Sequence, residues 1–272
     1  MFYLKQNKTQ QEEYQKNLEL IGSLSNLFSS SSVPLLDSRV VENLFCLAFN
    51  AENLGRADQS VDATKDGLGI GLKTFKNDKG PTYQKVAQFK AARFDKDVKP
   101  IEIAELRNKR ITATEKVNGL FQSIYHCVLR EKYRLKLFEE SMNKIDLSKI
   151  SNINHKPSSI FFDDGKDEYK YTTADSQLWK RFDTKNYLHE FEVQILLDPI
   201  YELRRLLDNN TLSVDSHPLH TIFLPLYSRD KNTKEKTVFP KSGLNQWNAK
   251  GRVRHPNEVY IPIPKEIHKL FP

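Results

Sequence analysis

Apolar positions recur at helical spacing in two segments near the N-terminus. Residues 8–28 alternate charged and apolar positions with a helical period, and this run ends at the four serines 29–32. In DSRVVENLFCLAFNAENL (37–54), Asp37 or Ser38 can cap the first turn of a helix that has a broad apolar face. The pattern therefore predicts two helices separated by a break.

The next segment, VDATKDGLGIGLKTF (61–75), has the pattern of two short strands about a turn at Asp66-Gly67. Its glycines stand at alternate positions from Gly67 to Gly71. Glycine weakens a strand because it adds backbone entropy and no packing, so this spacing is typical of a turn, a bulge or a close approach by another backbone or ligand. We therefore expect a hairpin whose second strand ends at Lys73.

Both patterns occur in the following part of the chain. Helical spacing predicts helices within 80–94, 99–120, 174–182 and 199–210. Alternating positions bounded by turn signals predict strands at 123–130, 133–140, 158–164, 168–173 and 191–198. We expect these strands to form a mixed sheet, so the expected fold class is α+β.

The composition and the residue pattern change after residue 210. Residues 211–218, TLSVDSHP, have the composition of a linker, and the residues beyond them are extended, proline-bearing and β-like. We expect a boundary near 212–219, which gives a first domain over 1–211 and a β-rich C-terminal segment over 212–272.

The composition indicates a soluble globular protein. Apolar residues make up 38% of the 272 positions, which is enough to bury a core. No run approaches the roughly 18 consecutive apolar residues of a membrane span. The N-terminus also lacks the apolar core of a signal peptide, so we expect a cytoplasmic protein with no membrane partner. Cys46 and Cys127 stand in apolar contexts without a second thiol nearby, which favours buried thiols over a disulfide or zinc site.

The net charge of +7 is concentrated near the C-terminus. Residues 228–272 contain ten Lys or Arg against four Asp or Glu. A basic segment of this kind can neutralise nucleic-acid phosphates, and the alternative is a solvated basic surface.

Asp62 and Lys73 are the candidate chemical groups of the predicted hairpin. Counting outwards from the turn sets Asp62 opposite Lys73 or Leu72, at one end of the sheet. A carboxylate and a lysine placed in this way suit Mg²⁺-dependent cleavage of a phosphodiester. In the alternative reading Asp62 caps a loop and Lys73 is a surface lysine.

These residues resemble the core of the PD-(D/E)XK nucleases. The resemblance covers Asp62, the strand that ends at Lys73, a preceding helix with Glu42 and a following helix with Gln84. It implies that Asp62 and Glu42 bind Mg²⁺, that Lys73 activates or orients the attacking water, and that Gln84 lies near the phosphate. The position two before the lysine, normally acidic in the family, is Gly71. The second metal carboxylate then comes from elsewhere, or the site is degenerate. The candidates for that carboxylate are Glu42, Glu52 and Asp58.

The segment KSGLNQWNAKGRVRHPNEVYIPIP (241–264) is rich in amide, basic and aromatic side chains. Amides can read base edges, basic groups suit phosphates or guanine, and an indole can stack or anchor a loop. The candidate DNA-binding residues are Lys241, Asn245, Gln246, Trp247, Arg252, Arg254 and Asn257. The alternative is a polar loop pinned by a buried Trp.

This segment also resembles the start of the C-terminal DNA-reading β-pseudobarrel of NgoFVII-type restriction endonucleases. The resemblance implies a type II restriction endonuclease that cuts double-stranded DNA with Mg²⁺ and acts beside a cognate DNA methyltransferase. Cutting both strands favours a homodimer. The segment is short for a pseudobarrel, so we expect a partial recognition domain or a truncated chain. The alternatives are a non-catalytic DNA-binding restriction subunit and an RNA-processing nuclease.

Overall fold

A computed structural model describes residues 1–55, 59–77, 82–89, 98–208, 228–229, 233 and 236–237. The chain divides into two units, Met1–Arg205 (unit 1) and Leu206–Pro272 (unit 2). In unit 2, β12 (Ser228–Arg229) pairs with β13 (Lys236–Thr237) in an antiparallel arrangement. The predicted boundary at 212–219 and all seven candidate DNA-binding residues lie outside the described residues.

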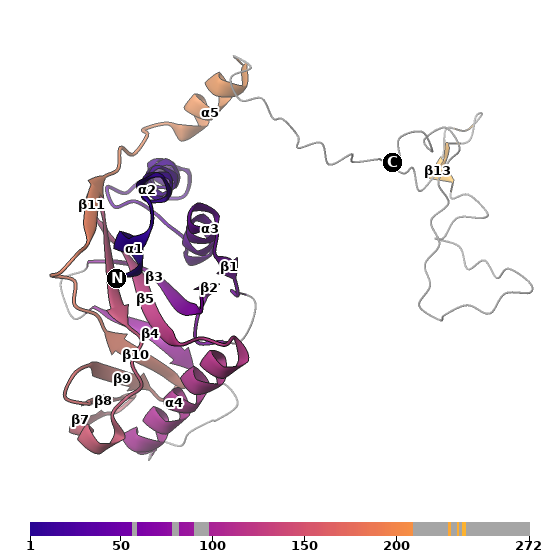
Figure 1. The fold of residues 1–272 in the computed structure, drawn as a ribbon. Coiled ribbons are helices and arrows are strands. Elements are labelled where there is room, and N and C mark those ends of the chain that lie inside the picture. The colour runs from indigo at the N-terminus through magenta and orange to yellow at the C-terminus, as the bar shows by residue number, and fades with distance from the viewer. Residues whose placement is uncertain are drawn as a thin grey trace, which may run out of the picture. The chain divides into compact units, whose positions relative to one another are not determined.

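Unit 1 is built on a mixed sheet, sheet A (Figure 1). Its strands, in spatial order, are β1 (Glu52–Asn53), β2 (Ala63–Lys65), β3 (Leu68–Lys76), β5 (Gln122–Glu131), β6 (Arg134–Ser141) and β11 (His189–Glu192). β3 and β5 are parallel and the other neighbouring strands are antiparallel. The predictions of a mixed sheet and of an α+β fold are therefore confirmed.

The N-terminal helices cover one face of sheet A (Figure 1). They are α1 (Phe2–Lys5), α2 (Lys8–Ser23), the 3₁₀ helix η1 (Ser25–Leu27) and α3 (Ser38–Phe49). Asp37 caps α3, because its carboxylate accepts a hydrogen bond from the Arg39 N–H at 2.8 Å. Phe45 and Phe49 of α3 pack with Ile70 of β3 in a fully buried core, so the two predicted helices are confirmed.

The predicted hairpin at Asp66-Gly67 is confirmed, but its second strand, β3, continues to Lys76 and does not end at Lys73. Asp66 and Gly67 have φ values of 49° and 75°, and Lys65 pairs with Leu68 across them. Two successive residues with positive φ are typical of the turns whose twist matches that of a two-stranded ribbon. The turn therefore fixes the register that places Asp62.

Helix α4 (Pro100–Val117) connects the parallel strands β3 and β5 and packs on the other face of sheet A. It also covers the inner face of a second sheet, sheet B. The antiparallel strands of sheet B, in spatial order, are β4 (Tyr83–Gln88), β10 (Gln177–Arg181), β9 (Glu168–Thr172), β8 (Ser159–Asp163) and β7 (Ser151–Lys156). Proline at the start of α4 and Gly119 with φ +62° after its end bound it as predicted. The short 3₁₀ helix η2 (Leu147–Lys149) precedes β7.

Two of the predicted helices are wrong. Residues 83–88 and 177–181 are strands β4 and β10, which pair with each other. Their apolar positions fit a helix or a strand equally over so short a run, and pairing between residues far apart in sequence decides the outcome. The predicted strands at 158–164 and 168–173 are present as β8 and β9, but in sheet B rather than in the mixed sheet.

Two further elements lie close to their predicted places. The turn between β5 and β6 falls at Lys132-Tyr133, with Tyr133 at φ 55°. Helix α5 (Pro199–Asp208) lies within the helix predicted at 199–210. The strand predicted at 191–198 is largely wrong, because β11 (His189–Glu192) shares only its first two residues. In the described part of the chain, no helix is long and apolar enough to cross a bilayer.

Candidate catalytic site

Asp62 lies where β2 stops pairing with β3. The last pair of this ladder is Ala63 with Ile70, so Asp62 stands beside Gly71 rather than opposite Lys73. The Asp62 N–H donates to the Ile70 carbonyl at 2.9 Å, and its Oδ2 accepts from the Leu72 N–H at 2.8 Å. The Asp62 carboxylate thus accepts the hydrogen bond from the Leu72 N–H where β2 no longer supplies a backbone carbonyl. This hydrogen bond fixes the position of the carboxylate.

Glu42 reaches the same region from α3. The residue is 6% exposed, and its Oε2 lies 2.6 Å from Arg39 Nη1. Burial raises the pKa of Glu42, and the Asp62 carboxylate raises it further. Arg39 and Lys73 act in the opposite direction. Asp62 and Lys73 therefore both act on the pKa of Glu42, in opposite directions.

The Cys46 thiol of α3 is affected by the same two carboxylates, Glu42 and Asp62. Burial raises the pKa of this thiol to about 11, and Glu42 and Asp62 contribute to the shift. The thiol stays protonated at neutral pH and acts as a small apolar side chain, as predicted.

Gly55, which follows β1, lies close to both side chains of the Arg39–Glu42 ion pair. A Cβ atom placed on Gly55 would lie 2.3 Å from Arg39 Nη1 and 2.5 Å from Glu42 Oε2. Such distances are too short for any side chain. Glycine at this position lets the backbone after β1 pass over the ion pair.

Lys73 is half-buried on β3, where it is the register partner of Cys127 on β5. Side chains alternate along a strand, so Lys73 shares a side of sheet A with Gly71 and Phe75, which packs into the core beneath α4. The pKa of the fully buried Cys127 is raised, chiefly by burial and also by Glu140. Lys73 acts in the opposite direction but does not reverse this shift. Within the described residues, the Lys73 ammonium forms no ion pair.

The space beside Gly71 is filled. A Cβ atom at Gly71 would lie 2.7 Å from Met142 Cε and 3.1 Å from Tyr125 Cδ1. The Tyr125 ring is itself held, because its hydroxyl accepts a hydrogen bond from Arg107 Nη2 at 2.7 Å. An acidic side chain at Gly71 would therefore require these neighbours to move.

Of the two alternative carboxylates that the structure describes, Glu42 is the one whose pKa is affected by Asp62. Glu52 is exposed on the edge strand β1, and its Oε2 lies 3.5 Å from the Thr64 hydroxyl. Asp58 lies outside the described residues. Glu42 therefore stays the candidate for the second carboxylate among the described residues.

Gln84 does not lie on a helix after the hairpin, as expected from the resemblance. It belongs to β4 of sheet B, where it is the register partner of Lys180. Among the described residues, no hydrogen bond or ion pair joins it to Asp62 or Glu42. Its predicted place near the phosphate has no support from this geometry.

The donor set at Asp62 and Glu42 fits a hydrated Mg²⁺. Each carboxylate has one oxygen engaged by a protein donor, which leaves Asp62 Oδ1 and Glu42 Oε1 for a cation. Mg²⁺ in proteins commonly keeps several waters and takes one or two carboxylates. A cation would also relieve the repulsion that raises the pKa of Glu42. In the described part of the chain, no group of three or more His, Cys, Asp or Glu side chains is placed to hold a metal ion.

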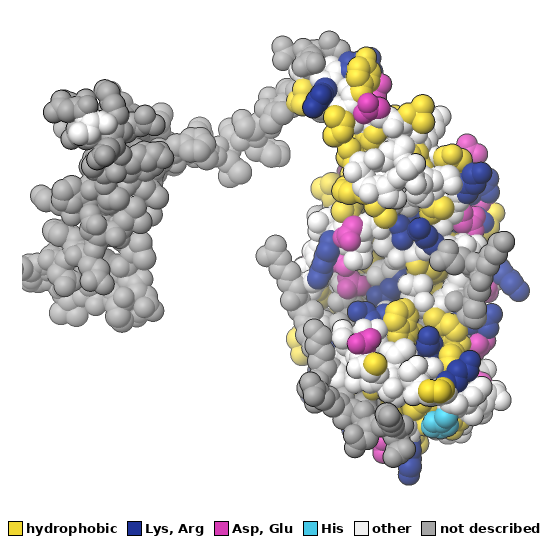
Figure 2. Space-filling model, turned by 180° about the vertical axis from the view of Figure 1, so that it is seen from behind, with side chains coloured by type: hydrophobic (Ala, Val, Ile, Leu, Met, Phe, Trp, Pro, Cys, Tyr) yellow, Lys and Arg dark blue, Asp and Glu magenta, His cyan; other side chains and the backbone are white. Residues whose placement is uncertain are grey.

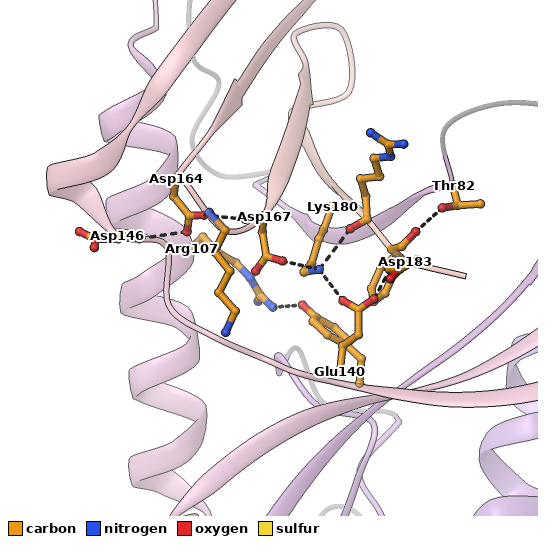
Figure 3. A network of polar contacts seen from close by, with 12 residues as sticks. Thr82, Arg107, Glu140, Asp146, Asp164, Asp167, Lys180 and Asp183 are labelled. Atoms are coloured by element: carbon orange, nitrogen blue, oxygen red, sulfur yellow. Dashed lines mark hydrogen bonds and ion pairs between the residues drawn. The ribbon is translucent and has the colours of Figure 1, made fainter. Parts of the chain in front are cut away.

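A second polar cluster surrounds Lys180 (Figure 3). The ammonium lies 2.6 Å from Glu140 Oε2, 2.9 Å from Asp167 Oδ1 and 3.1 Å from the Arg181 carbonyl. Burial alone would lower the pKa of Lys180, but the two carboxylates outweigh it and raise that pKa. All three donors are satisfied, so Lys180 acts as an ionic link between β6 of sheet A and sheet B.

The Lys180 cluster lines an open cavity of about 730 Å³. Glu139, Asp183 and Tyr187 also border it. This cluster was not predicted from the sequence, because its acidic and basic members come from segments far apart in the chain. Lys180 occupies an inward position in the alternating run LWKRF, which is the one local sign of a buried lysine that needs acidic partners.

No family model matches the chain, and no curated protein or solved structure matches it either.

Proposed function

We propose that the protein is a type II restriction endonuclease that hydrolyses phosphodiester bonds in double-stranded DNA, sequence-specifically and with Mg²⁺. One observation carries this proposal. Asp62 is held by the Leu72 N–H where β2 leaves β3, and the charges of Asp62 and Lys73 both act on the pKa of Glu42. This is the group of residues on which the resemblance to PD-(D/E)XK nucleases rests.

In this proposal Asp62 and Glu42 hold the metal with their free oxygens. Bound Mg²⁺ would polarise a phosphate oxygen and lower the pKa of a coordinated water. The Leu72 N–H fixes the Asp62 carboxylate, so the ligand is positioned before the metal arrives. Lys73 supplies positive charge beside the attacking water and the phosphate.

Sequence reading is proposed to come from the C-terminal segment. The excess of Lys and Arg over 228–272 would bind phosphates, and the amide and Arg side chains of 241–257 would contact base edges. The proposal includes action in the cytoplasm, as a homodimer, beside a DNA methyltransferase that protects host DNA.

Purified full-length protein, mixed-sequence plasmid and Mg²⁺ test the proposal directly. Discrete fragments are expected from the wild type, and chelation should stop cleavage. Asp62→Ala and Lys73→Ala should each abolish cleavage while specific DNA binding remains measurable. Glu52→Ala is the matched control, because it removes a nearby exposed carboxylate on the neighbouring edge strand. Normal cutting by either site variant would reject this site.

The second candidate is a DNA-binding restriction subunit without catalysis. It is favoured by the filled space beside Gly71 and by a described donor set that stops at two carboxylates. A salt-sensitive gel shift without fragments, across a panel of plasmids and divalent cations, would support this candidate. Comparing duplex DNA and RNA as competitors in the same assay tests the third class, an RNA-processing nuclease.

A further inference from the structure

Sheet B has one apolar face and one aromatic and basic face. The inner face contributes buried residues such as Ile160, Tyr171 and Leu178 to the core beneath α4. Side chains alternate along each strand, so the intervening residues lie on the outer face. The outer face carries Phe161 on β8, Lys170 on β9 and Trp179 on β10.

These outer residues form one row across four strands. Phe161 is the register partner of Lys170, Lys170 of Trp179, and Trp179 of Lys85 on β4. Register partners stand side by side with Cβ atoms roughly 5 Å apart. The row therefore alternates aromatic and basic side chains across the sheet.

Further aromatic and basic groups adjoin the row. The Lys156 ammonium lies 4.8 Å from the centroid of the Phe161 ring, and the Lys170 ammonium lies 5.8 Å from it. The Tyr83 and Phe161 ring centroids are 6.1 Å apart. Arg181, two residues after Trp179, is exposed on the same face. The sheet B platform is defined by seven residues: Tyr83, Lys85, Lys156, Phe161, Lys170, Trp179 and Arg181.

The surface over these strands has the same mixed character. Figure 2 shows hydrophobic and Lys or Arg side chains interspersed over the lower half of unit 1, where sheet B lies in Figure 1. Among the described residues, the outer positions of strands β8 and β9 include two acidic side chains. Glu168 is 2.6 Å from Arg181 Nη1, and Asp163 accepts hydrogen bonds from Ser151 and Asn152. The ion pair with Glu168 also engages Arg181, so Lys85, Lys156 and Lys170 provide the excess positive charge of the platform.

Each part of this arrangement matches a chemical group of an unpaired polynucleotide. Tyr83, Phe161 and Trp179 are each partly exposed, and the Trp179 Nε1 is buried. Partly exposed aromatic rings on a sheet face offer stacking surfaces for bases, and lysines between them neutralise the backbone phosphates. The bases of a duplex are stacked on one another, so their faces are not available to such a surface. The charge and the rings together select a single strand over a duplex or an apolar peptide.

We propose that the sheet B platform binds single-stranded nucleic acid, with bases stacked on Phe161, Trp179 and Tyr83 and with phosphates held by the four basic residues. The long side chains of Lys156 and Lys170 move from the Phe161 ring to the phosphates when a base stacks there. This binding uses none of Glu42, Asp62 or Lys73. It is therefore independent of the proposed cleavage.

Trp179 provides a local signal for the test, because the chain has only one other tryptophan, Trp247. Full-length protein carrying Trp247→Phe is titrated with a 15-nucleotide dT strand, a 15-nucleotide U strand, a 15-base-pair duplex and inorganic polyphosphate. Saturable quenching of Trp179 fluorescence by dT, by U or by both is expected, and the stronger of the two identifies the DNA or RNA source. The duplex and polyphosphate should leave the emission nearly unchanged.

Matched variants in the Trp247→Phe background separate stacking from a general charge effect. Phe161→Leu should weaken single-strand binding about tenfold, since stacking on one aromatic side chain is worth that much or more. Phe121→Leu removes an aromatic ring that is 76% exposed elsewhere and should change nothing. Lys156→Ala should weaken binding and reduce its salt dependence, whereas Lys132→Ala, which removes a lysine stacked on Tyr133, should not.

Three results would overturn the proposal: no quenching by either single strand, equal quenching by polyphosphate or duplex, or equal affinities for Phe161→Leu and Phe121→Leu. Circular dichroism confirms that each variant is folded. Asp62→Ala should quench as the parent does. Failure of the nuclease proposal is thus distinguishable from failure of this one.

Discussion

The Asp62 carboxylate and the Leu72 backbone N–H are joined by a hydrogen bond of 2.8 Å at the point where β2 leaves β3. One oxygen of Asp62 thus has a structural role and the other is free for chemistry. This division allows charge and hydrogen bonding to be separated by mutation.

Asp62→Asn is expected to abolish Mg²⁺-dependent cleavage with little loss of stability. The asparagine Oδ1 can still accept from the Leu72 N–H, but the negative charge that attracts the metal is gone. Asp62→Ala should lose cleavage and also about 1 kcal/mol of unfolding free energy, because the hydrogen bond is removed. Plasmid cleavage and urea unfolding measure the two effects. Equal stabilities of the two variants would show that the bond to Leu72 contributes nothing.

Glu42→Gln is expected to stabilise the metal-free protein at neutral pH. The pKa of Glu42 is raised on folding, chiefly by burial and then by Asp62, so its charged form is disfavoured in the native state. The stability associated with the neutral form is present below the ordinary Glu pKa of about 4.3 and is lost as pH rises through the higher native pKa. The gain from Glu42→Gln should therefore be largest above that native pKa and vanish at acidic pH.

Thermal melts of the wild type and Glu42→Gln between pH 4 and pH 8 measure this difference. Adding Mg²⁺ at pH 8 should reduce the stability difference between Glu42→Gln and the wild type, because a cation favours the ionised Glu42 of the wild type. A gain that is constant with pH would contradict the assignment to Glu42 ionisation.

Lys180→Met is expected to destabilise the protein by about 3–5 kcal/mol, because it leaves the Glu140 and Asp167 carboxylates without their shared cation. Lys170→Met, one strand away on the outer face, is the matched control and should change stability by less than about 1 kcal/mol. Urea unfolding at pH 7 makes the comparison. Similar losses for both variants would remove the distinction between an ionic link and a surface lysine.

Gly71→Ala is expected to cost about 1–3 kcal/mol, because the added methyl group meets Met142 and the Tyr125 ring. Met142→Ala should also destabilise, through the cavity it leaves. The double variant should lose less than the sum of the two, since the new methyl group occupies part of that cavity. Additive losses in denaturant unfolding would show that Met142 does not restrict this position.

Local signals predicted much of the framework. The cap at Asp37, the positive-φ turn at Asp66-Gly67 and the glycine after α4 are encoded by adjacent residues, so these elements lie where the sequence places them. The pairing of Asp62 with Glu42 is an expectation from the resemblance, and the place of Asp62 opposite Lys73 or Leu72 was predicted by counting along the hairpin. The counting erred by one or two positions, because Asp62 is beside Gly71.

The errors share a physical cause. Residues 83–88 and 177–181 become strands because they pair with each other across almost a hundred positions of sequence, which no local pattern reports. The filled space beside Gly71 likewise depends on Tyr125 and Met142, which are far from it in the chain. Such contacts can be read only from the assembled sheets.

The connection between β3 and β5 has a consequence for the order of folding. The hairpin that carries Asp62 and Lys73 closes through a two-residue turn, a local event on the microsecond scale. The parallel pairing of β3 with β5 joins two strands that β4 and α4 separate along the chain, and such non-local pairing is slow. During synthesis the hairpin emerges well before β5, so Lys73 gains its neighbour Cys127 only after most of unit 1 has left the ribosome.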